Sequence, residues 1–261
     1  MLGKLIKYDT RFVINRGLIV FYALSLAFGG LTRFFNLFDN SLALDIIGKI
    51  CSGVTISMFF NIIINNLMRM WVRFKQNFYG DESYLTHTLP VTKTTHYLSK
   101  FLTALLTTFI SFGVILLTAF IAYYSEQNWN TLLSLMAPVK EMFGEYIIAQ
   151  LLIILFLEFF NALQCGFTGI ILGHKMNSAK VGLSVIFGLM VYGATQTIAV
   201  VSVLIAAIFN SDVWKVFTSS DMISSDTASI ILYIALAVYA ALAVAGYILN
   251  TKLLKSGVNV D

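Results

Sequence analysis

The sequence predicts an all-α polytopic membrane protein with six transmembrane helices, an amphipathic N-terminal interfacial helix and a short cytoplasmic helix between spans two and three. Hydrophobic residues make up 58% of the chain, charged residues only 11%, and the mean hydropathy is +0.83. Soluble domains carry about a quarter charged residues. The apolar residues form blocks of about 20, the length that a helix needs to cross the hydrocarbon of a bilayer. A soluble domain with a buried core does not account for these blocks.

We predict a single transmembrane domain over residues 1–261. Its spans are predicted near residues 17–35, 47–70, 101–124, 146–173, 181–209 and 228–250. Residues 71–100 are predicted to form a cytoplasmic loop, the largest polar segment of the chain. Only Pro90 and Pro138 punctuate the sequence, and neither falls within a predicted span.

Residues 1–16 form an amphipathic pattern. The residues near one helical face are apolar: Leu2, Leu5, Ile6, Phe12 and Val13. Those largely off that face are basic: Lys4, Lys7 and Arg11. This pattern predicts a helix that lies at the membrane interface; the alternative interpretation is a plain basic flank of the first span.

The basic residues predict the orientation. Thirteen of the 17 Lys and Arg residues lie on one side of the six predicted spans. The other four are Arg33, Lys49, Lys140 and Lys215. Because basic residues resist translocation, the richer side is predicted to be cytoplasmic, and an even number of spans places both termini there. The net charge of +4 therefore indicates topology, and we predict no nucleic-acid partner.

The loop over residues 71–100 has an internal pattern. Gly80, Asp81 and Glu82 predict a turn that opens a short helix, since acidic groups are favoured near a helix N-terminus. Pro90 predicts its end, and Thr92 is a suitable cap for the next helix, which continues into the third span. A short helix between two turns suits docking, although an ordered connector that binds nothing has the same pattern.

Residues 78–100, FYGDESYLTHTLPVTKTTHYLSK, resemble the loop after the second span of bacterial ABC-2 type permeases, the membrane subunits of ATP-binding cassette exporters. The six-span layout, the amphipathic N-terminus and the short basic tail are similar across almost the whole chain, but only this loop is motif-like. The resemblance implies a coupling helix that transmits nucleotide-driven movement from an ATPase. The residues it assigns to this coupling segment are Gly80, Asp81, Glu82, Ser83, Tyr84, Leu85, Thr86, His87, Leu89 and Pro90.

The resemblance also implies partners and a location. The expected partners are cytoplasmic ATP-binding cassette ATPase subunits, a second permease subunit, identical or different, and the lipid bilayer. ATP and Mg are expected on the ATPase, because this chain contains no G-x-x-x-x-G-K-[ST] phosphate loop. We therefore expect no cofactor and no enzyme activity in this chain, and a multi-pass location in a bacterial plasma membrane. The substrate class stays open among peptide, lipid and drug.

Polar residues inside the predicted spans are candidates for a translocation path, because a polar group in hydrocarbon needs a partner or water. Ser57, Asn61 and Asn65 recur every four residues, as do Thr103, Thr107 and Ser111. The candidates for the path are Ser57, Asn61, Asn65, Thr107, Ser111, Glu158, Asn161, Gln164 and Gln196. The alternative for the Ser and Thr residues is hydrogen bonding between helices. Glu158 fits a functional and a structural role equally well.

Other functional classes have less support in the sequence. An ion-coupled secondary transporter is the main alternative, and Glu158 is the only acidic residue well inside a predicted span. An intramembrane enzyme is a weaker one, since the three histidines lie outside the spans. Within the permease family, a subunit that confers immunity to a membrane-active peptide is also possible. Neither the histidines nor Cys51 and Cys165 have metal-ligand spacing, so we predict no metal site.

Overall fold

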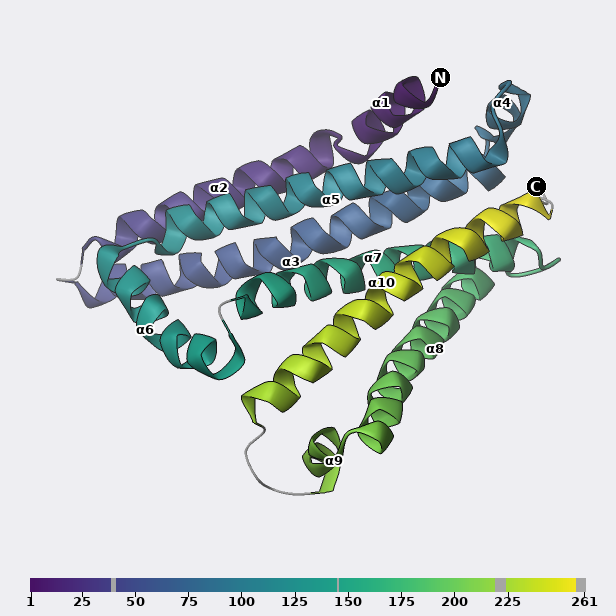
Figure 1. Cartoon of the computed structure of the whole chain (residues 1–261). Helices are drawn as coiled ribbons and strands as arrows, with labels where there is room; N and C mark the ends of the chain where they lie inside the picture. Colours follow the sequence, from purple (N-terminus) through teal and green to yellow (C-terminus); the bar gives the residue numbers. More distant parts are fainter. Residues whose placement is uncertain (39–40, 145, 219–223, 257–261) are drawn as a thin grey trace. The chain divides into compact units, whose positions relative to one another are not determined.

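The computed structural model describes residues 1–38, 41–144, 146–218 and 224–256, apart from the side chains of His87 and Met142. All regular structure in this part of the chain is helical (Figure 1). The helices are α1 Leu2–Val13, α2 Arg16–Asn36, α3 Leu42–Tyr79, α4 Ser83–Thr88, α5 Lys93–Tyr123, α6 Glu126–Phe143, α7 Ile147–His174, α8 Lys180–Phe209, α9 Ser211–Thr218 and α10 Ser225–Lys255. Six of them, α2, α3, α5, α7, α8 and α10, are long and apolar enough to cross a membrane. The all-helical class and the six candidate spans agree with the sequence prediction.

Several helices continue past the ends of the predicted spans. The longest, α3, has 38 residues, which corresponds to roughly 57 Å at 1.5 Å per residue and exceeds the hydrocarbon thickness. Much of the segment predicted as the loop 71–100 is therefore helical, and only residues 80–92 lie between α3 and α5. Hydropathy falls where charged residues begin, but the helix continues because no glycine or proline interrupts residues 71–79.

Two of the segments between the predicted spans, residues 125–145 and 210–227, also contain helices. They are α6, which accommodates Pro138, and α9. The side chain of Asn210 starts α9 by accepting a hydrogen bond from the backbone N–H of Asp212 at 2.9 Å. Neither is among the helices that are long and apolar enough to span a membrane, so a search for apolar blocks does not find them.

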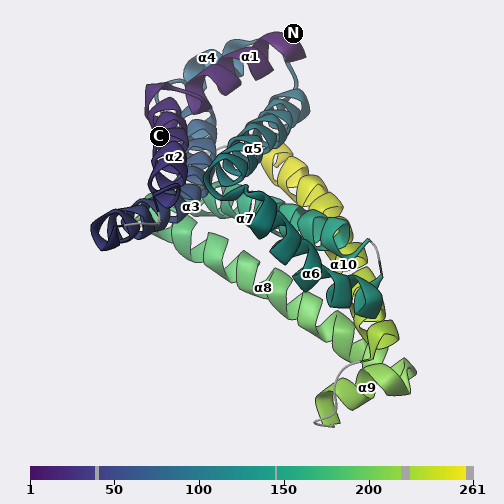
Figure 2. The ribbon, with the colours of Figure 1, turned by 90° about the vertical axis from the view of Figure 1, so that its left-hand side faces the viewer.

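The chain divides into two compact units, residues 1–131 and 132–261, and each is described by itself. In unit 1, α2 packs against α3 and α5, and α1 and α4 lie at one end of these helices (Figures 1 and 2). Polar side chains join the three long helices. The Tyr22 hydroxyl lies 2.8 Å from the Ser111 hydroxyl, and the hydroxyls of Thr32 and Thr55 are 3.2 Å apart.

In unit 2, α7 packs against both α8 and α10, and α9 joins the last two. The α7–α8 contact is close because it is made by glycines. A Cβ atom on Gly169 would meet the backbone of Ser184 and Gly188, and one on Gly173 would meet the backbone of Ser184. Small residues at these two positions let the two helices approach closely. On the α10 side, the Thr168 hydroxyl donates to Asn250 Oδ1 at 2.8 Å.

Candidate functional site

The coupling segment predicted from the sequence, residues 80–90, forms a short connector with its own helix. The backbone N–H of Gly80 donates to the Lys75 carbonyl and closes α3. The Gly80 carbonyl accepts from the Ser83 N–H at 2.9 Å, and α4 then runs for six residues. Its end comes directly before Leu89 and Pro90, as the sequence predicts. Thr92 caps α5, its side chain accepting a hydrogen bond from the Thr95 N–H.

The α4 segment has one buried face and one exposed face. Ser83 is fully buried and Thr86 is nearly so, whereas Tyr84 and Leu85 are 71% and 72% exposed. Exposed neighbours on the segment are Asp81, Thr88, Leu89 and Pro90. The side chain of His87, also predicted for this segment, lies outside the described part of the structure. The short helix therefore exposes a tyrosine and a leucine to solvent.

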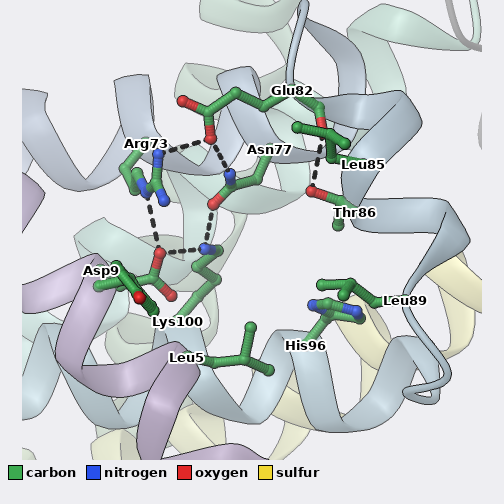
Figure 3. A pocket seen from close by; sticks show the side chains of 11 residues that line it. Leu5, Asp9, Arg73, Asn77, Glu82, Leu85, Thr86, Leu89, His96 and Lys100 are labelled. Atoms are coloured by element: carbon green, nitrogen blue, oxygen red, sulfur yellow. Dashed lines mark hydrogen bonds and ion pairs between the residues drawn. The ribbon is translucent and has the colours of Figure 1, made fainter.

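Six polar side chains from α1, α3, α5 and the start of α4 bond to one another beneath this helix. We call them the anchor cluster: Asp9, Arg73, Asn77, Glu82, Ser99 and Lys100 (Figure 3). Asp9 is its centre. One carboxylate oxygen, Oδ1, accepts from Arg73 Nε at 2.9 Å and from Lys100 Nζ at 2.5 Å. The other, Oδ2, accepts from the Ser99 hydroxyl at 2.9 Å.

Arg73 and Asn77 connect Asp9 to the α4 segment. Arg73 Nη1 and Asn77 Nδ2 both donate to Glu82 Oε2 at 2.7 Å. The Asn77 amide oxygen accepts from Lys100, and the Arg73 guanidinium lies over the Phe12 ring, 4.7 Å from its centroid. Two carboxylates and two cations balance in charge. The side chains of Asp9 and Lys100 are 3% and 4% exposed and that of Glu82 is 45% exposed, so the cluster runs from the protein interior to its surface.

A pocket of about 190 Å³ opens beside the anchor cluster. Figure 3 shows Asp9, Arg73 and Glu82 on one side of it, with Leu5, His96 and Leu89 completing the wall. One wall of the pocket thus consists of charged side chains whose charges balance, and apolar side chains of α1 and the α4 segment form other walls. A space of this size can admit part of a side chain from another protein.

The sequence reasoning found the α4 segment but not the residues that anchor it. Asp9 was the detectable signal, because it is the only acidic residue in the first 16 and it follows Leu5 by four positions on the apolar face of the predicted helix. A carboxylate there needs a buried cation. Lys100 and Arg73 had been counted only as topological charges.

The candidate path residues of spans two and three differ in their surroundings. Ser111 bonds to Tyr22, and the Thr107 hydroxyl donates to the Ala104 carbonyl; both residues are buried within unit 1. Ser57 is exposed, and Asn61 and Asn65 are partly exposed on one face of α3. These two amides donate to the carbonyls four residues earlier, each at 2.9 Å. Of these five candidates, the three on α3 present polar side chains outward.

Two candidates of span four hold unit 2 together. Asn161 Nδ2 donates to the Thr195 hydroxyl on α8 at 2.9 Å, and Gln164 Nε2 donates to the Ala243 carbonyl on α10 at 3.0 Å. Both residues are buried. Their hydrogen bonds link neighbouring helices, the role that polar side chains often have inside membranes.

Glu158 and Gln196 lie together in unit 2. Glu158 Oε1 accepts hydrogen bonds from the Tyr192 hydroxyl and from Gln196 Nε2, both at 2.7 Å. The Tyr239 hydroxyl donates to Gln196 Oε1 at 3.0 Å. We call these four residues, from α7, α8 and α10, the Glu158 cluster. Sequence reasoning had named Glu158 and Gln196 but not the two tyrosines, which it could not tell from packing residues.

The fold defines a helical, multi-pass membrane protein, by the length and composition of its six apolar helices. No family model, curated protein or solved structure matches this chain. Among the described residues, two clusters combine a carboxylate with polar side chains from three or more helices: the anchor cluster of unit 1 and the Glu158 cluster of unit 2.

Proposed function

We propose that this chain is the membrane-spanning subunit of an ATP-binding cassette exporter, and that a separate cytoplasmic ATPase docks on the α4 segment. One observation carries the proposal: two largely exposed side chains, Tyr84 and Leu85, sit on a short helix whose base is fixed by the anchor cluster. Tyrosine is one of the residue types enriched among those that carry most of the binding energy of protein interfaces. The resemblance of residues 78–100 to the coupling loop of ABC-2 permeases agrees with this assignment.

Transmission of force requires that α4 be attached rigidly to the long helices, and the anchor cluster provides this attachment. Glu82 begins α4 and bonds to Arg73 and Asn77 on α3. Through Asp9 the same network reaches α1 and, through Lys100, α5. A push on α4 is therefore delivered to three helices together, two of which are long enough to cross the membrane.

The rest of the proposal follows from this role. ATP and Mg bind to the ATPase subunits, and a second permease subunit, identical or different, completes the transporter in a bacterial plasma membrane with both termini cytoplasmic. A peptide, lipid or drug is moved along polar surfaces. Ser57, Asn61 and Asn65 support such a surface, because they form the outward polar face of α3.

Photo-crosslinking in cells tests the docking site. A benzoylphenylalanine placed at Leu85 is expected to crosslink to a polypeptide that mass spectrometry identifies as an ATP-binding cassette ATPase. The same residue placed at Phe217, which is 52% exposed on α9, is the matched control and is expected to give no such product. A Leu85 position that never crosslinks to an ATPase, or a Phe217 position that does so equally, contradicts the proposal.

A second candidate, an ion-coupled secondary transporter, is favoured by the Glu158 cluster, because acidic groups inside spans often mark ion pathways. The two functions differ in their energy source. Substrate movement in vesicles that contain only this chain and a proton gradient supports ion coupling. Movement that requires the ATPase and ATP supports the exporter.

A further inference from the structure

Helix α6, Glu126–Phe143, has one apolar face and one polar face. The large apolar side chains recur at helical spacing: Trp129, Leu132, Leu133, Met136, Val139 and Phe143. The opposite face is polar: Gln127, Asn130, Thr131, Ser134 and Glu141. None of the α6 residues whose side chains are described is buried, and Trp129, Leu132 and Leu133 are 48%, 49% and 43% exposed. A contiguous apolar face of this kind marks an interaction site.

Both ends of α6 are held close to the ends of candidate membrane spans. Two residues, 124–125, separate it from α5, and three, 144–146, separate it from α7. At 3.8 Å between consecutive Cα atoms, these connections cover at most about 11 Å and about 15 Å. The apolar sequence of the spans continues to both connections, since residues 101–123 and 147–157 contain no Asp, Glu, Lys or Arg. α6 therefore starts and ends near the border of the hydrocarbon layer.

The length of α6 excludes a helix that stands upright on the membrane. Its 18 residues span roughly 27 Å at 1.5 Å per residue. An upright helix would carry Phe143 that far from the surface, beyond the reach of the connection back to α7. α6 therefore lies along the surface. Gly144 ends the helix with a φ of 87°, a left-handed conformation that glycine adopts readily, and so permits the turn toward α7.

An aromatic run joins the outward side of α5 to the apolar face of α6. The rings of Phe120 and Tyr124 are stacked with centroids 4.5 Å apart, and the Tyr124 and Trp129 centroids are 6.2 Å apart. All three side chains are exposed. Asn128 Nδ2 donates to the Tyr123 carbonyl at 3.0 Å, which fixes the first turn of α6 to the end of α5. The apolar face is thus continuous with the exposed surface of a candidate span, and tryptophan and tyrosine are enriched where such surfaces meet water.

The charges of α6 favour a lipid surface that is bound through apolar contact. The helix has one lysine, Lys140, and two glutamates, Glu126 and Glu141, so anionic lipid does not attract it. Lys140 lies at the edge of the apolar face, where a lysine can extend its ammonium group to the headgroups and keep its methylene stem among the acyl chains. Helices that lie on membranes combine an apolar face of this kind with a polar face in water.

We propose that α6 is a membrane-surface helix, whose apolar face lies at the boundary between lipid headgroups and acyl chains and whose polar face lies in water. The predicted topology places this surface outside the cell. The binding requires neither an ATPase nor a transported substrate. It holds the ends of α5 and α7 at the level of the membrane surface.

Spin-label accessibility in the full chain tests this placement. The protein is reconstituted in phosphatidylcholine vesicles with a nitroxide label on Leu132→Cys or, as the matched control on the opposite face, on Ser134→Cys. Collisions with dissolved oxygen report lipid, and collisions with a water-soluble nickel chelate report water. The ratio of oxygen to nickel collisions is expected to be severalfold higher at position 132 than at position 134. Equal ratios, or a higher ratio at position 134, overturn the proposal.

The same labels separate lipid from other coverings of the apolar face. If a second copy of the chain or another protein covers it, the label at position 132 collides with neither reagent, and the proposal fails. Vesicles that also contain phosphatidylglycerol are expected to give the same ratios, and insertion that occurs only with this anionic lipid contradicts binding through apolar contact. Both substituted residues are exposed, so neither change disturbs a packed core. Label on the native Cys51 and Cys165 is measured in the unsubstituted protein and subtracted.

Discussion

Asp9 is the residue on which the anchor cluster depends. Its two oxygens accept hydrogen bonds from Arg73, Ser99 and Lys100, so each oxygen has at least one donor. A buried ion pair adds little to stability compared with an apolar pair, but removing one partner leaves a buried charge without compensation. The cluster therefore acts less as a source of stability than as a constraint that fixes α1, α3 and α5 to one another.

Asp9→Asn is expected to lower the free energy of unfolding by about 3–5 kcal/mol, because the amide keeps the shape but leaves Lys100, 4% exposed, without its counter-charge. Denaturant unfolding in detergent micelles measures this loss. The double variant Asp9→Asn with Lys100→Met removes both charges and is expected to recover part of it. A double variant that loses the full sum of two independent effects contradicts the pairing.

The exposed pair of Asp45 and Lys49 provides the control for this experiment. Its side chains are 52% and 76% exposed, and the two residues are four apart on α3. Asp45→Asn is expected to change stability by less than about 1 kcal/mol, since water and salt screen such pairs. Equal losses at Asp45 and Asp9 indicate that burial is not what gives the anchor cluster its effect.

Among the elements, the α7–α8 pair depends most on the absence of side chains. A Cβ on Gly169 would lie 2.6 Å from the Gly188 Cα, a distance that requires the two backbones to separate. Gly169→Ala is therefore expected to destabilise the protein by about 1–3 kcal/mol, the usual cost of overpacking. Gly193→Ala on α8 has open space around it and is expected to be neutral or slightly stabilising, by up to about 1 kcal/mol. Denaturant unfolding compares the two, and equal effects contradict the close contact.

The attachment of α4 to α3 depends on the side chain of Glu82. Glu82→Ala removes both hydrogen bonds that hold the start of α4 to α3. Since Glu82 is half-exposed, the loss is on the order of 1 kcal/mol, and amide exchange within Ser83–Thr88 is expected to accelerate roughly fivefold. Exchange within α2 serves as the internal reference. Unchanged exchange in α4 shows that Glu82 does not hold it.

The elements also show what the sequence is able to predict. Apolar blocks identify all six long helices, and Gly80, Pro90 and Thr92 mark the bounds of α4 and the start of α5, because these signals are local. The extension of α3 to Tyr79 and the polar helices α6 and α9 leave no apolar block. The anchor cluster is harder still, since Asp9 and Lys100 are 91 residues apart and only tertiary packing joins them.

For the whole molecule, the number of spans between two segments determines whether they lie on the same side of the membrane. Three long apolar helices, α5, α7 and α8, separate the α4 segment from α9. If each crosses the membrane once, α4 and α9 lie on opposite sides. The excess of Lys and Arg on the α4 side predicts that this side is cytoplasmic.

Cysteine labelling in intact bacteria tests both the parity and the orientation. Lys215→Cys, on α9 with a 67% exposed side chain, is expected to react with a membrane-impermeant maleimide in intact cells. Tyr84→Cys, at a residue that is 71% exposed on α4, is expected to react only after permeabilisation. The native Cys51 and Cys165 are 8% and 4% exposed and add little background. Reversed labelling shows that the orientation is wrong. Equal labelling of both positions in intact cells shows that the number of crossings between them is even. In either case Tyr84 faces the outside, and the proposed docking of a cytoplasmic ATPase on α4 is contradicted.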